Sequence, residues 1–236
     1  MADAIGKAVL VQSVQAGAPK VSAGIVPVAV RLVNTSAKPI YAFKYKIVAT
    51  WADGTSTSSA SSEDLLALYL NVEQGRQLSS RPIFRSGEIH TIAGAIQTKN
   101  GALPVNCTAT ILMIAFGDRT AIGSSDDIGR LSSTRTSQAA SMSGLLTDLQ
   151  AVVQAADPVK AAKTRSEELN APQPGDPKVT DTLGNRISPN SLRTSMLLGY
   201  VTAVSGDPKR IAKQIAYTQA YVEELKLHAS LQAVNQ

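Results

Sequence analysis

Strict alternation of apolar and polar side chains marks the first half of the chain as β-structure. The clearest stretch is residues 40–51, and a period of two is the pattern of a half-buried strand. One face would carry Tyr41, Phe43, Tyr45, Ile47, Ala49 and Trp51, and the other Ala42, Lys44 and Lys46. Asp53-Gly54 follows and predicts a hairpin, because glycine accepts a positive φ without steric cost. The return strand over residues 55–59 is polar, which favours a sheet edge.

Similar patterns recur along residues 8–14, 25–34, 89–97, 107–116 and 120–122. About seven short strands separated by turns predict an antiparallel β-sandwich that ends near residue 124. Residues 107–116 are apolar on both faces, so we expect their second face to be covered as well. Between the strands, residues 63–71 predict a short helix with Ser62 as its N-cap.

The second half changes to helical periodicity. An apolar stripe predicts a helix over residues 136–156, and shorter stripes predict helices over 191–204 and 208–231. Residues 161–170 favour a more polar helix, and the Pro- and Gly-containing stretch 171–190 is typical of a linker. We therefore predict an α+β fold: a sandwich domain over 1–124 and a helical region over 125–236. The helices would dock on the sandwich and cover its exposed apolar face, or join a neighbouring subunit.

Three segments carry a resemblance to a known class of domain. They are residues 28–36 (VAVRLVNTS), 39–42 (PIYA) and 84–88 (FRSGE). Together they resemble bacterial extracytoplasmic immunoglobulin-like modules, in which an N-x-S turn precedes one strand and an F-x-P-G-E segment precedes another. Ser86 stands where that pattern has proline, and the paired cysteines of antibody domains are missing. The resemblance covers residues 8–124 and implies a cell-envelope or secreted module used for adhesion or as a spacer, without active residues.

Charge and composition exclude some function classes. The net charge is +5, but residues 1–124 carry eleven Lys and Arg against seven Asp and Glu, with no basic run. We therefore expect no nucleic-acid partner. No apolar stretch reaches the length of a membrane span. No signal peptide is visible at the N-terminus, so the chain is either cytoplasmic or a mature periplasmic, cell-surface or secreted protein that has lost its leader. Cys107 is the single cysteine and reads as a small buried side chain, with an intermolecular disulfide as the alternative.

Candidate chemistry is sparse, and the sequence predicts no catalytic residue and no cofactor. His90 and His228 lie far apart, and His90 would form a surface pair with Glu88 on the same strand face. Asp118, Asp126 and Asp127 are the candidates for a cation site, because calcium prefers clustered oxygen ligands. The alternative for residues 124–127 is helix capping, with the acids near the positive end of the helix.

Three functional hypotheses follow. The first is a non-enzymatic structural or interaction protein, with a protein partner or self-association through polar edge strands. The second is a carbohydrate- or peptide-binding module, which predicts an exposed aromatic platform. The third is a hydrolase at the junction of sandwich and helices, which requires His90 or His228 to meet an acid or a serine.

Overall fold

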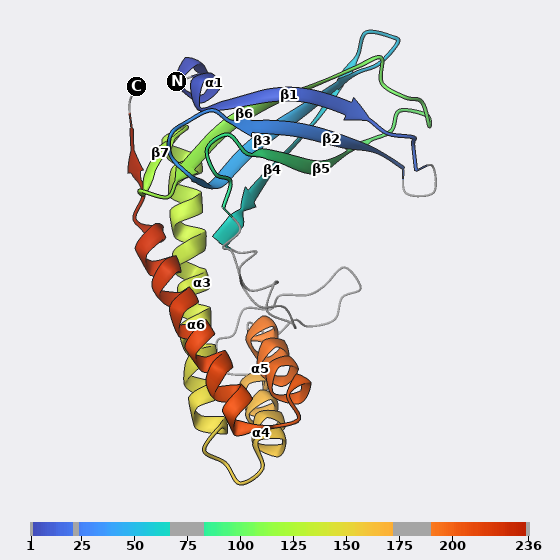
Figure 1. The fold of residues 1–236 in the computed structure, drawn as a ribbon. Coiled ribbons are helices and arrows are strands. Elements are labelled where there is room, and N and C mark those ends of the chain that lie inside the picture. The colour runs from blue at the N-terminus through green and yellow to red at the C-terminus, as the bar shows by residue number, and fades with distance from the viewer. Residues whose placement is uncertain (1, 21–23, 67–82, 172–189, 235–236) are drawn as a thin grey trace. The chain divides into compact units, whose positions relative to one another are not determined.

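The computed structural model describes residues 2–20, 24–66, 83–171 and 190–234 (Figure 1). The chain forms two compact units. The first is Met1–Ser133 together with His228–Gln236, and the second is Thr134–Leu227. The boundary therefore passes through two helices and does not fall at residue 124, where the sequence pattern placed it.

Two sheets and a short helix build the first unit (Figure 1). Helix α1 (Ala2–Ala8) leads into a three-stranded sheet of order β1-β2-β5, formed by β1 (Val9–Ala16), β2 (Ile25–Asn34) and β5 (Ile89–Gln97). The second sheet has the order β4-β3-β6-β7-β8. Its strands are β4 (Ser56–Asp64), β3 (Ile40–Thr50), β6 (Asn106–Phe116), β7 (Thr120–Ile122) and β8 (Gln232–Ala233). All pairings are antiparallel except β7 with β8. The predicted α+β content, with antiparallel strands first and helices later, is confirmed.

One apolar core lies between the two sheets. It takes Val28 and Ile92 from the three-stranded sheet, and Phe43 and Ile47 from the five-stranded sheet, each with at most 1% of its surface exposed. The two sheets pack tightly at Gly94, where an added Cβ would lie 2.5 Å from the Ile47 Cδ1 atom. Alternation placed these side chains correctly because burying one face of a strand fixes which residues point inward.

Tyr41 departs from the predicted alternation. The pairing of β3 with β6 shifts register between Ile40 and Ala42, so Ile40 joins the core between the sheets and Tyr41 does not. The Tyr41 ring instead lies against His228, with 4.7 Å between ring centroids. A local bulge of this kind reverses the faces on one side of it and leaves no mark in the hydrophobic pattern.

The outer face of β6 is covered, but only over part of its length. Met113 and Ala115 pack against Ile128 and Leu131 of helix α3 and against Leu231, which precedes β8. The predicted cover therefore comes from the first turns of α3 and from the residues after the last helix. Closer to its start, β6 exposes Thr108 and Thr110, so the strand is not apolar on both faces throughout.

The hairpin after β3 forms at Asp53-Gly54 as predicted, and β4 is the edge of its sheet. The strand is longer than expected and runs through Asp64, so Ser62 and Glu63 are strand residues and not the start of a helix. The Asp64 side chain accepts a hydrogen bond from the Leu66 N–H at 3.1 Å, and helical backbone begins there. Pairing with β3 outcompetes the capping signal of Ser62. Residues 67–71 of the predicted helix lie outside the described residues.

The segments that carry the resemblance to immunoglobulin-like modules contact each other through Asn34. Its side chain is fully buried, and its amide donates to the carbonyls of Lys38 and Phe84 at 2.9 and 2.8 Å. Its side-chain oxygen accepts from the N–H and the hydroxyl of Ser36 at 3.0 and 2.7 Å. The Gly87 N–H donates to the Asn34 carbonyl at 2.7 Å. The turn after β2 is thereby joined to the segment before β5.

In the described residues, the second unit consists of α4 (Pro158–Asn170), α5 (Ser191–Ala203) and most of α3 (Ser125–Val152) and α6 (Pro208–Ala229). Helix α3 begins well before residue 136, because Ser124 caps it: the Ser124 hydroxyl accepts from the Asp127 N–H at 3.2 Å. Asp157 caps α4 in the same way, with its side chain accepting from the Lys160 N–H. Nearly all of the predicted linker 171–190 lies outside the described residues.

One buried carboxylate joins three of these helices. Asp148 of α3 accepts from the Arg165 Nε of α4 at 2.9 Å and from the Arg193 Nε of α5 at 2.6 Å, and its side chain is 1% exposed. The hydrogen bond with Asp148 raises the pKa of Arg165. A buried charge that is paired twice in this way fixes the mutual register of the helices.

Candidate interaction surface

Two long edge strands, β4 and β5, end the two sheets of the first unit, and each offers a row of backbone groups without a ladder partner in the described part of the chain. The Trp51 N–H donates to the Thr55 carbonyl, so these two residues form a hydrogen-bonded pair. Hydrogen-bonded and non-hydrogen-bonded pairs then alternate along the ladder between β3 and β4. Ser56, Ser58, Ala60 and Ser62 therefore turn their N–H and C=O groups away from β3. The Thr98 N–H donates to the Gly24 carbonyl, so by the same reasoning Thr91, Ala93 and Ala95 of β5 turn their backbone groups away from β2.

These two edges lack the usual protection against pairing with another strand. Each is nine residues long, and each pairs with its inner neighbour without a register shift. Neither contains Pro, Lys or Arg, the residues that commonly blunt an edge. By contrast, β1 carries a bulge between Val11 and Ser13, and β8 is only two residues long. The unprotected edges are thus confined to β4 and β5 within the described residues.

The two edge strands are linked by a side-chain contact at one end and line a groove at the other. His90 Nε2 of β5 lies 2.9 Å from Glu63 Oε2 of β4, which links the two sheets. Near the opposite ends, residues 57–59 and 95–97 with Ile25 line an open groove of about 510 Å³. We call this side of the first unit, from the His90–Glu63 pair to the groove, the open side.

His90 meets an acid, but not the one that the sequence suggested. Glu88 instead lies against Arg85, at 3.4 Å. The imidazole of His90 packs against the rings of Phe43 and Phe84, with centroids 5.6 and 5.5 Å away. Contact with a strand of the other sheet could not be read from spacing along one strand.

The environment of this pair offers no activated nucleophile. No hydroxyl or thiol hydrogen-bonds to His90 among the described side chains. Burial raises the pKa of Tyr45, a hydrogen bond with Ser61 opposes the rise, and nearby Glu63 adds to it, so the phenol stays protonated. Burial likewise raises the pKa of the half-buried Cys107 thiol, which suits a packing side chain.

The three candidate cation ligands are not arranged as in a cation site, because they lie in two different segments and two of them pair with lysines. Asp118 lies in the turn before β7, where its carboxylate is 2.6 Å from Lys38 Nζ. Partial burial raises its pKa, but hydrogen bonds from Lys38 and Thr120 outweigh this and lower the pKa to about 2. In the first turn of α3, Asp127 pairs with Lys44 at 2.6 Å, and that hydrogen bond lowers its pKa, while Asp126 is exposed. Within the described ranges, no group of three or more His, Cys, Asp or Glu side chains could hold a metal ion.

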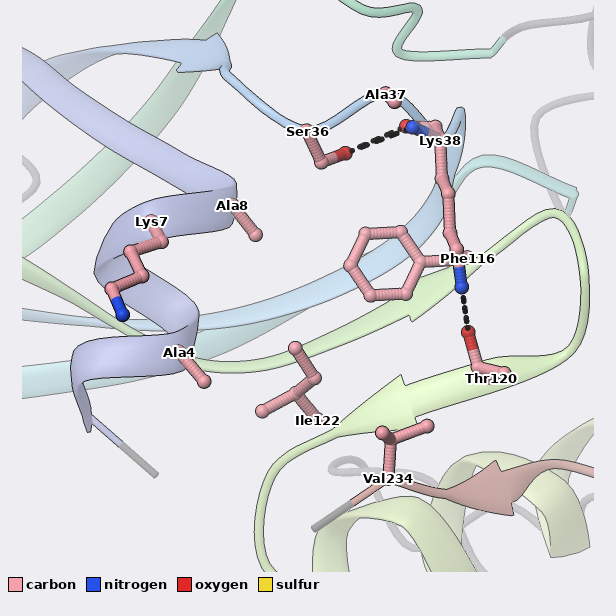
Figure 2. Close-up of a pocket in the computed structure, with 10 residues that line it drawn as sticks. All are labelled: Ala4, Lys7, Ala8, Ser36, Ala37, Lys38, Phe116, Thr120, Ile122 and Val234. Atoms are coloured by element: carbon pink, nitrogen blue, oxygen red, sulfur yellow. Dashed lines mark hydrogen bonds between the residues drawn. The ribbon is translucent and has the colours of Figure 1, made fainter. Parts of the chain in front are cut away.

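A second hollow lies elsewhere on the first unit (Figure 2). It has a volume of about 230 Å³ and an apolar lining that includes Ala4 and Ala8 of α1, Phe116 of β6 and Ile122 of β7. Lys38 passes beside the Phe116 ring, 5.5 Å from its centroid, and reaches Thr120 (Figure 2). The ammonium of Lys38 is compensated by Asp118, so Lys7 is the lining residue that can offer a positive charge to a ligand (Figure 2).

Comparison with known proteins adds no family to this picture: no protein family matches the chain, and no curated protein matches it. No helix in the described part of the chain is both long enough and apolar enough to cross a membrane.

Proposed function

We propose that this chain is a non-enzymatic structural or interaction protein of the cell envelope or extracellular space, which engages extended segments along its open side. An edge strand offers regularly spaced N–H and C=O groups, and an added strand gains affinity from main-chain hydrogen bonds. The carrying observation is the pair of nine-residue edges without bulge, proline or basic residue.

The placement in the envelope or outside the cell rests on the resemblance to immunoglobulin-like modules. It is supported by the hydrogen bonds that join Asn34 of one resembling segment to Phe84 and Gly87 of another. Such a placement is tested by fractionating cells that make the protein from its own gene. Recovery in the cytoplasmic fraction alone would contradict it.

The other two hypotheses have less support. A carbohydrate-binding module needs exposed aromatic side chains, whereas Phe43, Tyr45 and Trp51 are at most 5% exposed. A hydrolase needs a nucleophile beside its base, whereas His90 contacts a carboxylate and two aromatic rings. The open side therefore favours binding over catalysis.

A matched pair of substitutions tests the role of the edge. Ser58 of β4 and Thr108 of β6 both flank Val48 of β3, and both side chains are exposed on the outer face of the same sheet. Ser58→Lys puts a charge on the edge, while Thr108→Lys puts the same charge on an inner strand.

We expect tagged wild-type chain and Thr108→Lys to retain the same proteins from an envelope extract of the source cells. We expect Ser58→Lys, and Ala93→Lys on β5, to lose them. Retention that is equal for all four proteins would contradict the proposal.

A further inference from the structure

We infer that β4 pairs antiparallel with β4 of a second copy of this chain, so that two five-stranded sheets become one across a two-fold axis. This inference rests on the proposed function, since it names the partner of one edge of the open side. Two identical strands that pair antiparallel are related by a two-fold axis, and the pairing closes because it uses both β4 edges.

The backbone of β4 is prepared for such a pairing. Ser56, Ser58, Ala60 and Ser62 turn their backbone groups outward, and the ladder to β3 is regular along the whole strand. When the axis lies between Ser58 and Ala60, these residues face their counterparts: Ser58 faces Ala60 of the copy and Ser56 faces Ser62. Each copy then supplies alternating donors and acceptors where the other has acceptors and donors.

The lack of charge along β4 favours a second copy of the chain over a charged strand as its partner. Residues 56–62 carry no charged side chain, so β4 offers nothing that would pair with a charged strand, and its own sequence meets it without repulsion. Lys44 and Lys46 on β3 lie at least about 14 Å, or three strand spacings, from their counterparts, which exceeds the Debye length of about 8 Å at physiological salt. At the ends of the pairing, Asp64 approaches the turn of the copy, where Asp53 is already paired with Lys99.

Side-chain chemistry agrees with the backbone. On the exposed face Ser56 would lie opposite Ser62 of the copy, where serine pairs form cross-strand hydrogen bonds, and the small side chains of Ser58 and Ala60 would meet without a clash. The other edge, β5, is less suited to pairing with itself in this way, because its exposed Ala93 and Ala95 carry no hydroxyl group. The contact is small and polar, so we expect a reversible dimer whose population rises with concentration.

Analytical ultracentrifugation of the full chain over a range of concentrations tests this inference. We expect a monomer–dimer equilibrium for the wild type. Ser58→Lys brings two ammonium groups close to the axis and should raise the dissociation constant about tenfold or more. Thr108→Lys should leave the constant within about twofold of wild type, since it changes the same face away from the edge. Fluorescence of Trp51 verifies that each variant is folded.

A covalent probe locates the contact. Under mild oxidation, Ser59→Cys should give a disulfide-linked dimer, because Ser59 lies on the axis and faces its own counterpart in the copy, whereas Thr108→Cys should give none above wild type, which carries Cys107 alone. A wild type that stays monomeric at every concentration overturns the inference. A dimer that is unaffected by Ser58→Lys overturns it too. Neither result decides the proposed function, which is tested separately by cell fractionation and by the retention of envelope proteins on the edge variants.

Discussion

Replacing Asn34 by alanine should destabilise the two-sheet unit more than any change at the surface of the same turn. The side chain uses its full hydrogen-bonding capacity: two donated bonds to Lys38 and Phe84 and two accepted from Ser36. All four are lost in Asn34→Ala. Because the residue is fully buried, water cannot replace them without opening the turn.

The size of the loss in stability depends on which hydrogen bonds the partners of Asn34 keep. The Phe84 carbonyl still accepts from the Ile40 N–H at 2.9 Å, and the Ser36 hydroxyl, whose single proton no longer goes to Asn34, can donate to the Lys38 carbonyl 2.8 Å away. Neither carbonyl is left without a donor, so the full cost of an unsatisfied buried group does not apply. Four neutral hydrogen bonds at about 1 kcal/mol each then give a loss of about 3–4 kcal/mol in the free energy of unfolding.

Urea denaturation followed by tryptophan fluorescence measures this loss. Trp51 is the single tryptophan and is buried in the core between the sheets, so it reports on the first unit alone. Ser86→Ala, an exposed change in the neighbouring turn, is the control and should cost less than about 0.5 kcal/mol. Asn34→Asp should also be destabilising, because a carboxylate would face two carbonyl oxygens. A loss below about 1 kcal/mol in Asn34→Ala, or a stable Asn34→Asp, would refute this reasoning.

Two further predictions concern charged pairs. Asp148→Asn turns an amide N–H₂ toward an arginine donor and should cost the helical unit about 2–4 kcal/mol in denaturation followed by far-UV circular dichroism. Glu168→Gln, which alters only the exposed partner of Arg165, is the control, and an equal loss in both variants would contradict the role of Asp148. The Lys44 hydrogen bond lowers the folded-state pKa of Asp127, so their pair stabilises the fold above about pH 4 and is lost as the pH falls through that lowered value. Lys44→Met should therefore lose less stability than wild type on acidification, and parallel pH profiles would rule this out.

The strands could be predicted because burial of one face fixes their alternation, and the Asp53-Gly54 turn because few dipeptides tolerate its geometry. Features that depend on contacts between distant residues could not. Tyr41 left its expected face through a register shift with β6, and His90 found Glu63 on a strand of the other sheet. Both contacts depend on tertiary packing, which the spacing of residues along one strand does not indicate.

Helix ends show the same limit. The start of α3 lacks an apolar stripe, and it is helical because Ser124 caps it and because Ile128 and Leu131 pack on the sheet. Strand β8 is too short for any periodic signal. It is held by hydrogen bonds from the Gln232 N–H to the Arg119 carbonyl, just before β7, and from the Val234 N–H to the Ala121 carbonyl within β7. Of the candidate ligands, the capping alternative agrees with the position of Asp127, whereas Asp118 lies in a different turn with its own lysine.

The parallel pairing of β7 with β8 has a consequence for the order in which the protein folds. β7 ends at Ile122 and its outer neighbour begins at Gln232, with the whole helical unit between them in sequence. On the ribosome, where N-terminal parts fold first, the five-stranded sheet stays one strand short until the helices have been made. Leu231, part of the cover over Met113, arrives equally late. A nascent chain therefore carries an incomplete sheet through most of its synthesis. A stop codon just before residue 231, after the end of α6, would damage the N-terminal unit and leave the helices complete.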